Sequence, residues 1–440
     1  MRIEALAGQR VVVLGFGREG QSTYQVLSQR GQCADLSVWT EAGELPSGLP
    51  GKVASLDTGL GAFDVAIRSP GIRADHPALV AFREGGGRVL NPATIFLSER
   101  PEARIVGVTG SKGKSTTASL MAHLLRANGQ QVVLAGNIGV PLLDHLDSDF
   151  DVMVAELSSY QLADLEGLLS LGLITRLFPE HLDWHGSEAA YYGCKLRLAA
   201  LLSGRPLLIN GQDPILEQAT RSIEGRVMGN QPSTFHRDGD GLFHGSESLL
   251  TLNELQLIGR HNLDNAALAL QAAELLGADR DVSLQALRSF KPLVHRLERI
   301  TGPQGSDWVN DSIATSPHAT RAALESLRDQ RVVLIAGGLE RSADWSPVVG
   351  WCRDHPLAGL ITLPDNGRAV VEALVAGAAV DASAVRQVDD IESAVACAAS
   401  QQGSGETVLL SPGAPSFPQF RDFEERGDRF RKAIADLAVV

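Results

Sequence analysis

A glycine-rich loop between an apolar run and a helix-forming run constrains this chain more than any other feature. The loop is GVTGSKGKSTT at 107–117, after the β-prone residues 104–108 and before the run ASLMAHLLRA. A strand, a glycine-rich loop, Lys-Ser and a helix in this order cradle phosphates, because backbone N–H groups and the helix N-terminus hold phosphate oxygens. Lys114 is predicted to reach the β- and γ-phosphates of a nucleotide, and the Ser115 hydroxyl to bind Mg²⁺. Val108 stands where the usual motif has its first glycine, and the alternative is a glycine-rich turn with a surface lysine.

Short runs rich in Val, Ile and Leu alternate with longer stretches of helical periodicity. Continuous apolar strands separated by helices are typical of parallel sheets covered on both faces, so the predicted fold class is α/β. At about 150 residues per domain, 440 residues correspond to roughly three domains, with seams near 91–103 and 291–302. The Gly/Ser/Asp-rich segment 231–257 is expected to form a hairpin or small sheet. Strands are expected at 10–15, 104–108, 131–135, 151–157, 331–336 and 407–410.

The composition excludes several classes of protein. A net charge of −13 and an aromatic content of 5% argue against a nucleic-acid surface and against docking on anionic lipid. No apolar run approaches the ~18–20 residues of a membrane span, and the N-terminus lacks the apolar region of a signal peptide. The four cysteines have no paired spacing and suit a reducing compartment. We therefore expect a cytoplasmic protein without nucleic-acid or membrane partners.

The first predicted strand runs into Gly15-Phe-Gly-Arg-Glu-Gly20, which matches the dinucleotide fingerprint G-x-G-x-x-G. Glu41 follows about twenty residues later, where a ribose partner is expected, so NAD binding is one interpretation. Another nucleotide diphosphate in the same crevice and a bare structural turn are the alternatives.

Three titratable residues in the middle of the chain are further candidates. Glu156 ends a predicted strand and is well placed for Mg²⁺, although an isolated acid there is more often solvated. His181 precedes His185 by four residues, but no partner ligands for zinc are evident, and a lone histidine is more often structural. Lys195, on a probable helix, is by default a solvated surface lysine.

Polar residues in the second half are also candidates. Asn262 and Asn265 lie one helical turn apart and are suited to a base edge or a phosphate, or to capping the helix. Arg296 suits phosphate and Asp311 suits a ribose hydroxyl, with surface salt bridges as the alternative for both. The small residues of 411–417 follow the last predicted strand, where they would line a ligand crevice or form a simple turn.

The order of these motifs resembles the Mur ligases, ATP-dependent enzymes of peptidoglycan precursor synthesis and hence of cell-wall growth and division. Within that family the chain is most similar to the MurD type, which adds glutamate to UDP-N-acetylmuramoyl-L-alanine. ELSSYQL and the FEERG ending are the most typical of that type. The resemblance covers essentially the whole chain, on the motifs GVTGSKGKSTT, GNIGVPLL, ELSSYQL, PEHLDWH, KLR, GRHNLDNA, HRLE, NDSIAT and SPGAPSF–FEERG.

This resemblance implies an architecture and a reaction. The architecture is a Rossmann-like UDP-binding domain at 1–97, a central P-loop ATPase domain at 98–294 and a Rossmann-like amino-acid-binding domain at 295–440. In the implied reaction the substrate carboxylate attacks the γ-phosphate of ATP, and the glutamate amine then displaces phosphate from the acyl phosphate. ATP and Mg²⁺ are the implied cofactors. The implied partners are the two small-molecule substrates, and the protein is expected to be a monomer.

The functional positions of the family carry over residue by residue. Lys114, Glu156, His181 and Lys195 are the implied catalytic residues. Ser115 and Glu156 would bind one Mg²⁺ and His181 the second, while Lys195, if carbamylated, would orient Mg²⁺ as an anion. The other implied contacts are, for ATP, Gly110, Ser111, Lys112, Gly113, Lys114, Ser115, Thr116, Asn265, Arg296 and Asp311; for the UDP-substrate, Gly15, Phe16, Gly17, Arg18, Ser69, Pro70, Gly71, Asn137, Ser158 and Gln161; and for glutamate, Thr315, Arg341, Ser411, Pro415, Ser416 and Phe417.

Three departures from the MurD pattern lie in the region expected to bind glutamate. Ile313 and Arg341 stand where lysines are usual, and the usual Ser-Pro-Ala-Cys/Ala-Ala-Ser is Ser411-Pro-Gly-Ala-Pro-Ser416. Arg and Lys are not interchangeable at such a site. The pattern resembles a variant that adds L-glutamate, whose product a separate epimerase later inverts. We therefore predict L-glutamate addition, with D-glutamate addition as the alternative.

Functions of other kinds compete with this prediction. An NAD-linked dehydrogenase would use Gly15–Gly20 but leaves the Lys114 loop unexplained. A non-catalytic UDP-sugar sensor conflicts with the intact Lys114, Glu156 and Lys195. A folate polyglutamate ligase is less consistent with ELSSYQL and the FEERG ending.

Overall fold

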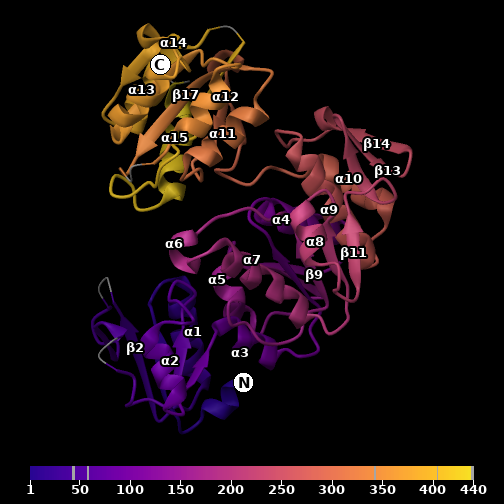
Figure 1. The fold of residues 1–440 in the computed structure, drawn as a ribbon, viewed down its shortest axis with the longest axis vertical. Helices are drawn as coiled ribbons and strands as arrows, with labels where there is room; N and C mark the ends of the chain where they lie inside the picture. Colours follow the sequence, from indigo (N-terminus) through magenta and orange to yellow (C-terminus); the bar gives the residue numbers. More distant parts are fainter. Residues whose placement is uncertain (42–44, 57–58, 341–342, 404, 438–440) are drawn as a thin grey trace. The chain divides into compact units, whose positions relative to one another are not determined.

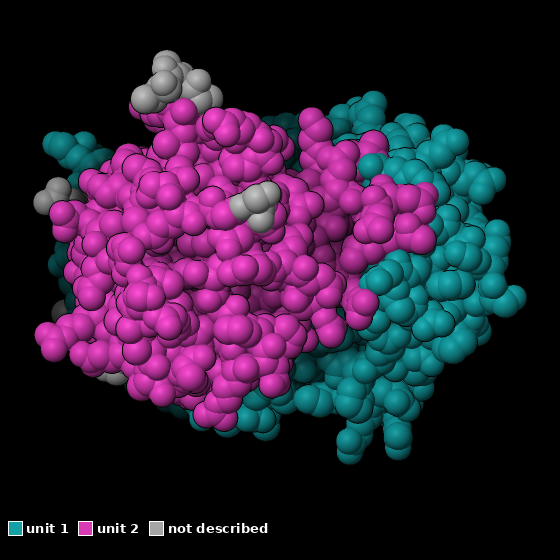
Figure 2. Space-filling view, turned by 90° about the horizontal axis from the view of Figure 1, so that it is seen from above, with its two compact units in different colours: residues 1–250, 263–288 teal, residues 251–262, 289–440 magenta. Residues whose placement is uncertain are grey.

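The computed structural model describes residues 1–41, 45–56, 59–340, 343–403 and 405–437. The chain divides into two compact units, which Figure 1 shows as a ribbon and Figure 2 in two colours. Unit 1 comprises residues 1–250 and 263–288, and unit 2 comprises residues 251–262 and 289–440. Parallel sheets dominate both units, so the predicted α/β class is confirmed. The boundaries at 97 and 294 stay a prediction.

The first sheet of unit 1 has the strand order β3-β2-β1-β4-β5, and all its strands are parallel. Both faces of the central strand are covered, because Val12 and Leu14 belong to one core cluster and Val11 to another. This two-sided burial is why the strand is continuously apolar. The strands are β1 (Arg10–Leu14), β2 (Asp35–Thr40), β3 (Gly51–Val53), β4 (Val65–Arg68) and β5 (Arg88–Leu90), and the helices are α1 (Arg18–Arg30), α2 (Pro77–Glu84) and α3 (Pro92–Glu99).

The second sheet of unit 1 has the order β11-β10-β9-β6-β8-β7 and is also fully parallel. Parallel strands place their carboxyl ends at one edge, where the loops after β6 and β8 meet. The strands are β6 (Ile105–Thr109), β7 (Val132–Gly136), β8 (Val152–Glu156), β9 (Leu171–Ile174), β10 (Leu207–Asn210) and β11 (Arg226–Gly229). The helices are α4 (Lys114–Ala127), α5 (Ser159–Leu162), α6 (Leu182–His185), α7 (Glu188–Leu196), α8 (Pro214–Ala219), α9 (His261–Leu275) and α10 (Arg280–Ser289).

A three-stranded sheet forms where a hairpin or small sheet was expected. It consists of β12 (Phe235–Asp238), β13 (Gly241–His244) and β14 (Glu247–Thr251), in that order, and β12 and β13 are antiparallel. The expectation for 231–257 is therefore confirmed.

The sheet of unit 2 has the order β15-β16-β20-β17-β18-β19. The pair β15–β16 is antiparallel, and the other neighbours are parallel. Along β17, Leu334 faces one core cluster while Val333 and Ile335 face another, the two-residue period of a strand. The strands are β15 (Glu298–Thr301), β16 (Asp307–Asn310), β17 (Arg331–Gly338), β18 (Gly359–Asp365), β19 (Val385–Gln387) and β20 (Glu406–Leu410), and the helices are α11 (Pro317–Ser326), α12 (Ser346–Cys352), α13 (Gly367–Ala376), α14 (Ile391–Gln401) and α15 (Phe423–Asp436).

The predicted strands match β1, β6, β7, β8, β17 and β20 to within two residues at each end. The four cysteines are free thiols, so no disulfide links them. Among the described residues, no helix has the length and apolar character needed to cross a bilayer.

Candidate active site

The glycine-rich loop joins β6 to α4, as the sequence predicts. Gly110 and Gly113 have φ of 146° and 86°, which only glycine adopts readily. A Cβ at Gly110 would lie 2.0 Å from Thr175 Oγ1, and one at Gly113 would lie 2.5 Å from Asn265 Oδ1. The loop therefore runs close against the residues that follow β9 and against the first turns of α9, which brings Asn265 to the loop.

Gly107 belongs to the strand and not to the loop. It lies within β6, where a Cβ would meet Leu169 Cδ1 at 2.7 Å and Leu198 Cδ1 at 2.8 Å. This glycine serves core packing, because the side chains of neighbouring elements fill the space beside it. The missing first glycine of the usual motif is therefore not replaced by its neighbour.

Ser111 is already bonded within the protein. Its N–H donates to Arg176 O at 2.6 Å, and its hydroxyl accepts from Tyr191 Oη at 3.0 Å and from Phe178 N at 3.0 Å. These bonds shape the loop, but they already use the N–H and the hydroxyl of Ser111 that would otherwise bind a ligand. Lys112 forms an ion pair with Glu180 at 2.9 Å. Lys114 Nζ donates to Ser111 O at 3.0 Å, and the side chains of Ser115 and Thr116 open α4 in buried positions.

Glu156 ends β8, next to the strand that leads into the loop, with Val108 and Glu156 in register. Its carboxylate is fully buried. Oε1 accepts from Asn137 Nδ2 at 2.7 Å, whereas buried Oε2 has no hydrogen-bond partner among the described residues. A buried carboxylate oxygen without a partner is costly unless something binds it, which marks this atom as a ligand position.

Lys195 lies on α7 and is 2% exposed, so its default interpretation as a surface lysine is wrong. Its pKa is lowered well below the ordinary value, first because burial disfavours the ammonium and second because Lys114 is close and positive. Glu180 and Glu156 act in the opposite direction. Lys114, Glu156 and Lys195 therefore interact electrostatically at one place. A lysine with a lowered pKa supplies the neutral amine needed to react with carbon dioxide.

His181 precedes α6 and has a left-handed backbone, with φ of 55°. Burial lowers its pKa, and the charges of Lys114 and Lys195 lower it further, while Glu180 and Asp183 oppose this. His185 is buried, stacks on Tyr160 with ring centroids 5.6 Å apart, and is hydrogen-bonded to Ser159 Oγ at 2.9 Å. His185 is therefore a core residue of the α5–α7 region, while His181 lies near the site.

The residues fit a magnesium ion held jointly with phosphates. No group of three or more His, Cys, Asp or Glu side chains converges to hold a metal within the described ranges. Mg²⁺ is usually bound by one or two protein groups together with substrate phosphates and water. Glu156 Oε2, the one buried carboxylate oxygen without a described partner, matches that mode better than a metal cage made only of protein.

The two predicted UDP-binding loops lie side by side at the carboxyl edge of the first sheet. A Cβ at Gly15 would lie 3.0 Å from Ser69 Oγ, and one at Gly20 would lie 2.0 Å from Gly15 O. The first glycine thus permits the tight turn, and the last permits close approach of α1. Arg18 Nη1 contacts Gly139 O at 3.4 Å. Phe16, Gly17, Pro70 and Gly71 lie on the same two loops.

Ser158 and Gln161 form a capping box at the start of α5, directly after Glu156. Gln161 Oε1 accepts from Ser158 N at 2.9 Å, and its Nε2 donates to Glu19 Oε1 at 2.7 Å. This amide thus connects the start of α5 with the start of α1. Burial raises the pKa of Glu19 despite the hydrogen bond from Gln161.

The predicted residues of the last third lie in unit 2. Asp311 follows β16, and its Oδ2 accepts from Ser411 Oγ at 3.1 Å. Arg296 lies in the turn before β15. Thr315 is exposed, Ser411 is buried, and Phe417 is 64% exposed. Pro415 O accepts from Leu339 N at 3.1 Å, and Ser416 is also buried. Arg341 lies outside the described residues.

Sequence reasoning missed a buried polar network beside the first sheet. Arg68, the last residue of β4, is fully buried and pairs with Asp164 at 2.5 Å, and Asn91 Nδ2 donates to the same carboxylate at 2.9 Å. A single arginine or aspartate outside any recognisable motif does not indicate a buried ion pair. The one available signal is the position of Arg68 directly before Ser69-Pro-Gly71.

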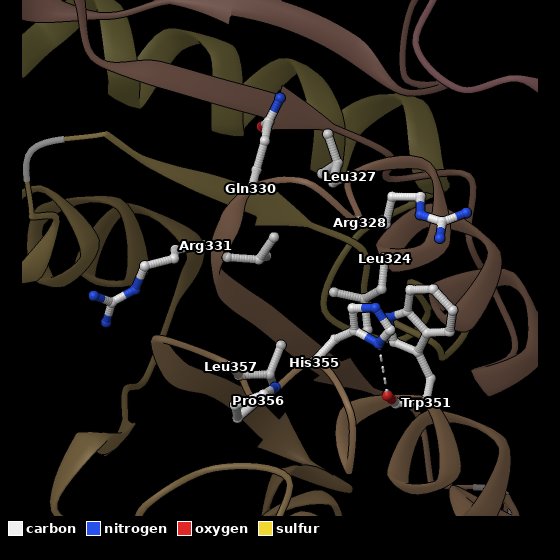
Figure 3. A pocket seen from close by; sticks show the side chains of 10 residues that line it. Leu324, Leu327, Arg328, Gln330, Arg331, Trp351, His355, Pro356 and Leu357 are labelled. Carbon is white, nitrogen blue, oxygen red and sulfur yellow. Dashed lines mark hydrogen bonds between the residues drawn. The ribbon is translucent and has the colours of Figure 1, made fainter. Parts of the chain in front are cut away.

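A cavity of about 360 Å³ in unit 2 is lined by none of the predicted site residues (Figure 3). The rings of Trp351 and His355 stack there with centroids 4.1 Å apart, and His355 Nδ1 lies 3.3 Å from Trp351 O. Arg331, also on its rim, pairs with Glu406 at 3.3 Å.

Comparisons with known proteins identify the family. The Mur ligase middle domain matches residues 108–273, and the domain described as "Mur ligase, glutamate ligase domain" matches 295–413. A protein of Micromonospora sp. named UDP-N-acetylmuramoyl-L-alanine--L-glutamate ligase is 39% identical over 100% of this chain and 99% of its own length. A protein of the same name from Xanthomonas campestris pv. campestris is 37% identical over 98% of this chain and 96% of its own.

Solved structures share the fold at low sequence identity. UDP-N-acetylmuramate-alanine ligase MurC of Thermotoga maritima covers 96% of this chain, with 98% of its own length, a TM-score of 0.60 and 18% identity. MurF of Thermotoga maritima in complex with ADP covers 98%, with 96% of its own length, a TM-score of 0.60 and 16% identity. Folylpolyglutamate synthase of Mycobacterium tuberculosis covers 76% of this chain, with 92% of its own length, a TM-score of 0.58 and 15% identity. With relatives at 39% identity over its whole length, the chain belongs to the Mur ligase family of ATP-dependent amide-forming ligases.

Proposed function

We propose that this ligase adds L-glutamate to UDP-N-acetylmuramoyl-L-alanine. The observation that carries the proposal is the buried pair Glu156 and Lys195, with half-buried Lys114 beside it on a phosphate-type loop. The names of the full-length relatives support the substrate and the L-isomer. An NAD-linked dehydrogenase is not retained, because the family forms amide bonds.

The reaction proceeds through an acyl phosphate. An oxygen of the alanine carboxylate attacks the γ-phosphorus of ATP, the bond to the β,γ-bridging oxygen breaks, and ADP leaves. The amine of glutamate then attacks the acyl carbon and loses a proton, phosphate leaves, and an amide remains. Phosphoryl transfer of this kind depends mainly on positioning and on charge stabilisation.

The residues have distinct roles in this scheme. Lys114 neutralises charge on the transferred phosphoryl group, and Gly110, Gly113 and Asn265 shape the cradle around it. Ser115 and Glu156 would hold one Mg²⁺ and His181 a second, and the metal would neutralise charge on the phosphate oxygens. Lys195 would act as a carbamate, because a buried neutral amine can take up carbon dioxide and become an anion. Asn137 orients Glu156 through the hydrogen bond to Oε1.

The other predicted positions complete the proposal. We place UDP on the loops at Gly15–Arg18 and Ser69–Gly71. The muramoyl-alanine lies at Asn137, Ser158 and Gln161, and glutamate at Thr315 and Ser411–Phe417. Arg296 and Asp311 would bind phosphate and ribose of ATP. The three domains at 1–97, 98–294 and 295–440 would carry UDP, ATP and amino acid respectively. The ligase would work as a cytoplasmic monomer, upstream of an epimerase that acts on its product.

Phosphate release from ATP tests the proposal. The purified chain receives Mg²⁺, ATP and UDP-N-acetylmuramoyl-L-alanine with either L- or D-glutamate, and Lys114→Ala serves as the inactive control. Release with L-glutamate alone is the expected result. Release with D-glutamate alone would retain the ligase but overturn the stereochemistry. No release with either amino acid, in a folded protein, would overturn the proposed function.

A further inference from the structure

We propose that Arg68 and Asp164 are positioning residues that hold the UDP-binding loops at a set distance from the acyl-transfer centre. The inference rests on the proposed function, in which one substrate molecule spans both places. Neither residue touches the reacting atoms. Their role is to fix the position of the UDP end of the substrate site relative to the acyl-transfer end.

The guanidinium of Arg68 connects two parts of unit 1. On its own side, Nη1 donates to Pro70 O at 3.1 Å and to the carbonyl of Ile72, within the loop that follows β4. On the other side, Nε donates to Asp164 Oδ2 at 2.9 Å, and Nη2 donates to Asp164 Oδ1 at 2.5 Å and to Tyr160 O at 3.1 Å. A single buried side chain thus links the loop at 69–72 to the segment that carries α5.

The carboxylate of Asp164 accepts hydrogen bonds from two different side chains. It accepts two bonds from Arg68 and one from Asn91 Nδ2, which also donates to Gln161 O at 2.8 Å. Asn91 Oδ1 in turn accepts from Ala93 N at 2.9 Å at the start of α3. A buried ion pair is tolerated only when its remaining hydrogen bonds are satisfied, and here they are.

Two further contacts join the same elements. Trp184 Nε1, on α6, donates to Gly71 O at 3.0 Å, and Gln161 Nε2 donates to Glu19 Oε1 at 2.7 Å. Both UDP-binding loops are therefore attached to the segments that follow Glu156 and His181. Arg68 makes the most contacts of this set and is the most deeply buried.

A stabilising role alone does not account for this pair. An apolar pair of similar volume would stabilise such an interface about as well, because desolvation offsets most of the attraction between buried charges. A planar fork of donors adds defined geometry. Geometry matters for a ligand fixed at both ends, since a misplacement of about 1 Å costs roughly 100-fold in rate.

The test compares ligands that occupy one end of the site with a ligand that spans both. The double variant Arg68→Met with Asp164→Asn leaves no unpaired buried charge, and Arg68→Lys keeps the charge without the fork. Arg10→Met with Asp64→Asn is the control for loss of an Arg–Asp pair in the same sheet, because this more exposed pair at 2.7 Å lies at the amino edge and joins β1 to the residue before β4. Calorimetric titration measures the affinities for UDP, for ATP with Mg²⁺, and for UDP-N-acetylmuramoyl-L-alanine.

For the double variant we expect affinities for UDP and ATP within about threefold of wild type. We expect affinity for the full substrate to fall by roughly tenfold or more, and kcat to fall by about 10- to 100-fold. The affinity of Arg68→Lys for the full substrate and its kcat should lie between those of wild type and of the double variant. Both quantities should be unchanged in the control. Equal losses for UDP and the full substrate, or no loss, would overturn the inference. A wild-type protein that binds no UDP-N-acetylmuramoyl-L-alanine would instead overturn the proposed function.

Discussion

Trp345 occupies the space that a side chain at position 413 would need. A Cβ on Gly413 would lie 2.4 Å from Trp345 Cη2 and 2.9 Å from Thr320 Oγ1, and φ at Gly413 is 66°. Gly413 N also donates to Ala314 O at 3.1 Å, so the backbone cannot move away freely. The glycine that replaces the usual alanine of the 411–416 loop is thus matched to a buried tryptophan before α12.

Gly413→Ala should destabilise unit 2 and weaken glutamate binding. Overpacking against Trp345 costs about 1–3 kcal/mol, and the left-handed backbone adds about 1 kcal/mol. Urea denaturation measures the loss, and the KM for glutamate should rise. Gly405→Ala is the control, because Gly405 has φ of 80° and nothing within 4 Å of its Cβ position. An equal loss of unfolding free energy in Gly413→Ala and Gly405→Ala would show that the contact with Trp345 does not contribute.

Replacing Trp345 tests the same contact from the other side. In a Trp345→Phe background the smaller ring leaves room for the methyl group, so Gly413→Ala should cost about 1 kcal/mol less there. A double-mutant cycle in urea gives this coupling. Strict additivity of the two substitutions would contradict it.

Glu156→Gln should abolish most activity while leaving the fold intact. Glutamine retains an oxygen for the bond from Asn137, and the change removes a buried charge whose Oε2 has no hydrogen-bond partner among the described residues. An amide oxygen is a weaker Mg²⁺ ligand, so kcat should fall at least about 100-fold. Phosphate release over a MgCl₂ titration measures the effect. Glu166→Gln, at an exposed position in the same region, should remain active.

Lys195 should become carbamylated. Because burial lowers its pKa, a larger fraction of the amine is neutral than in an ordinary lysine, and the neutral amine is the form that reacts with carbon dioxide. Protein incubated with ¹³C-bicarbonate should show a carbamate carbon signal that Lys195→Ala lacks, and activity should fall in carbon dioxide-free buffer and recover with bicarbonate. Lys112→Ala, which removes a partly exposed lysine paired with Glu180, should keep the signal. A signal that survives Lys195→Ala would refute the assignment.

His185 should make the protein less stable in mild acid. Burial first, and then the nearby charges of His181, Lys195 and Arg73, lower the pKa of His185 from 6.5 to about 4. Between these values the unfolded chain binds a proton that the folded chain does not, so the free energy of unfolding falls as the pH falls through this window. After allowance for solvent screening, the total loss is about 2 kcal/mol at most.

His185→Gln should flatten this dependence, because glutamine can keep the bond to Ser159 but does not titrate. Urea denaturation at several pH values between about 4.5 and 7 measures the slope. His318→Gln, at an exposed position, should leave the slope unchanged. An unchanged slope in His185→Gln would assign the acid sensitivity to another group.

Features with local causes were predictable from the sequence. The phosphate loop between β6 and α4, Glu156 at the end of β8 and the small residues after β20 depend on short-range patterns: strand periodicity, glycine conformation and helix-start chemistry. The environment of Lys195 was not predictable in this way. Its helix could be inferred, but its burial beside Lys114 arises from segments eighty-one residues apart in the chain.

The sequence by itself determined the fold class, the order of the motifs and the family, because these follow from local periodicity and from residue identities along the chain. Only the tertiary structure decided which side chains share one environment. Gly107 turned out to serve packing, Lys195 is buried, and Arg68 joins Asp164 across ninety-six positions. Burial and charge pairing depend on contacts between distant segments, and no pattern within a single segment encodes them.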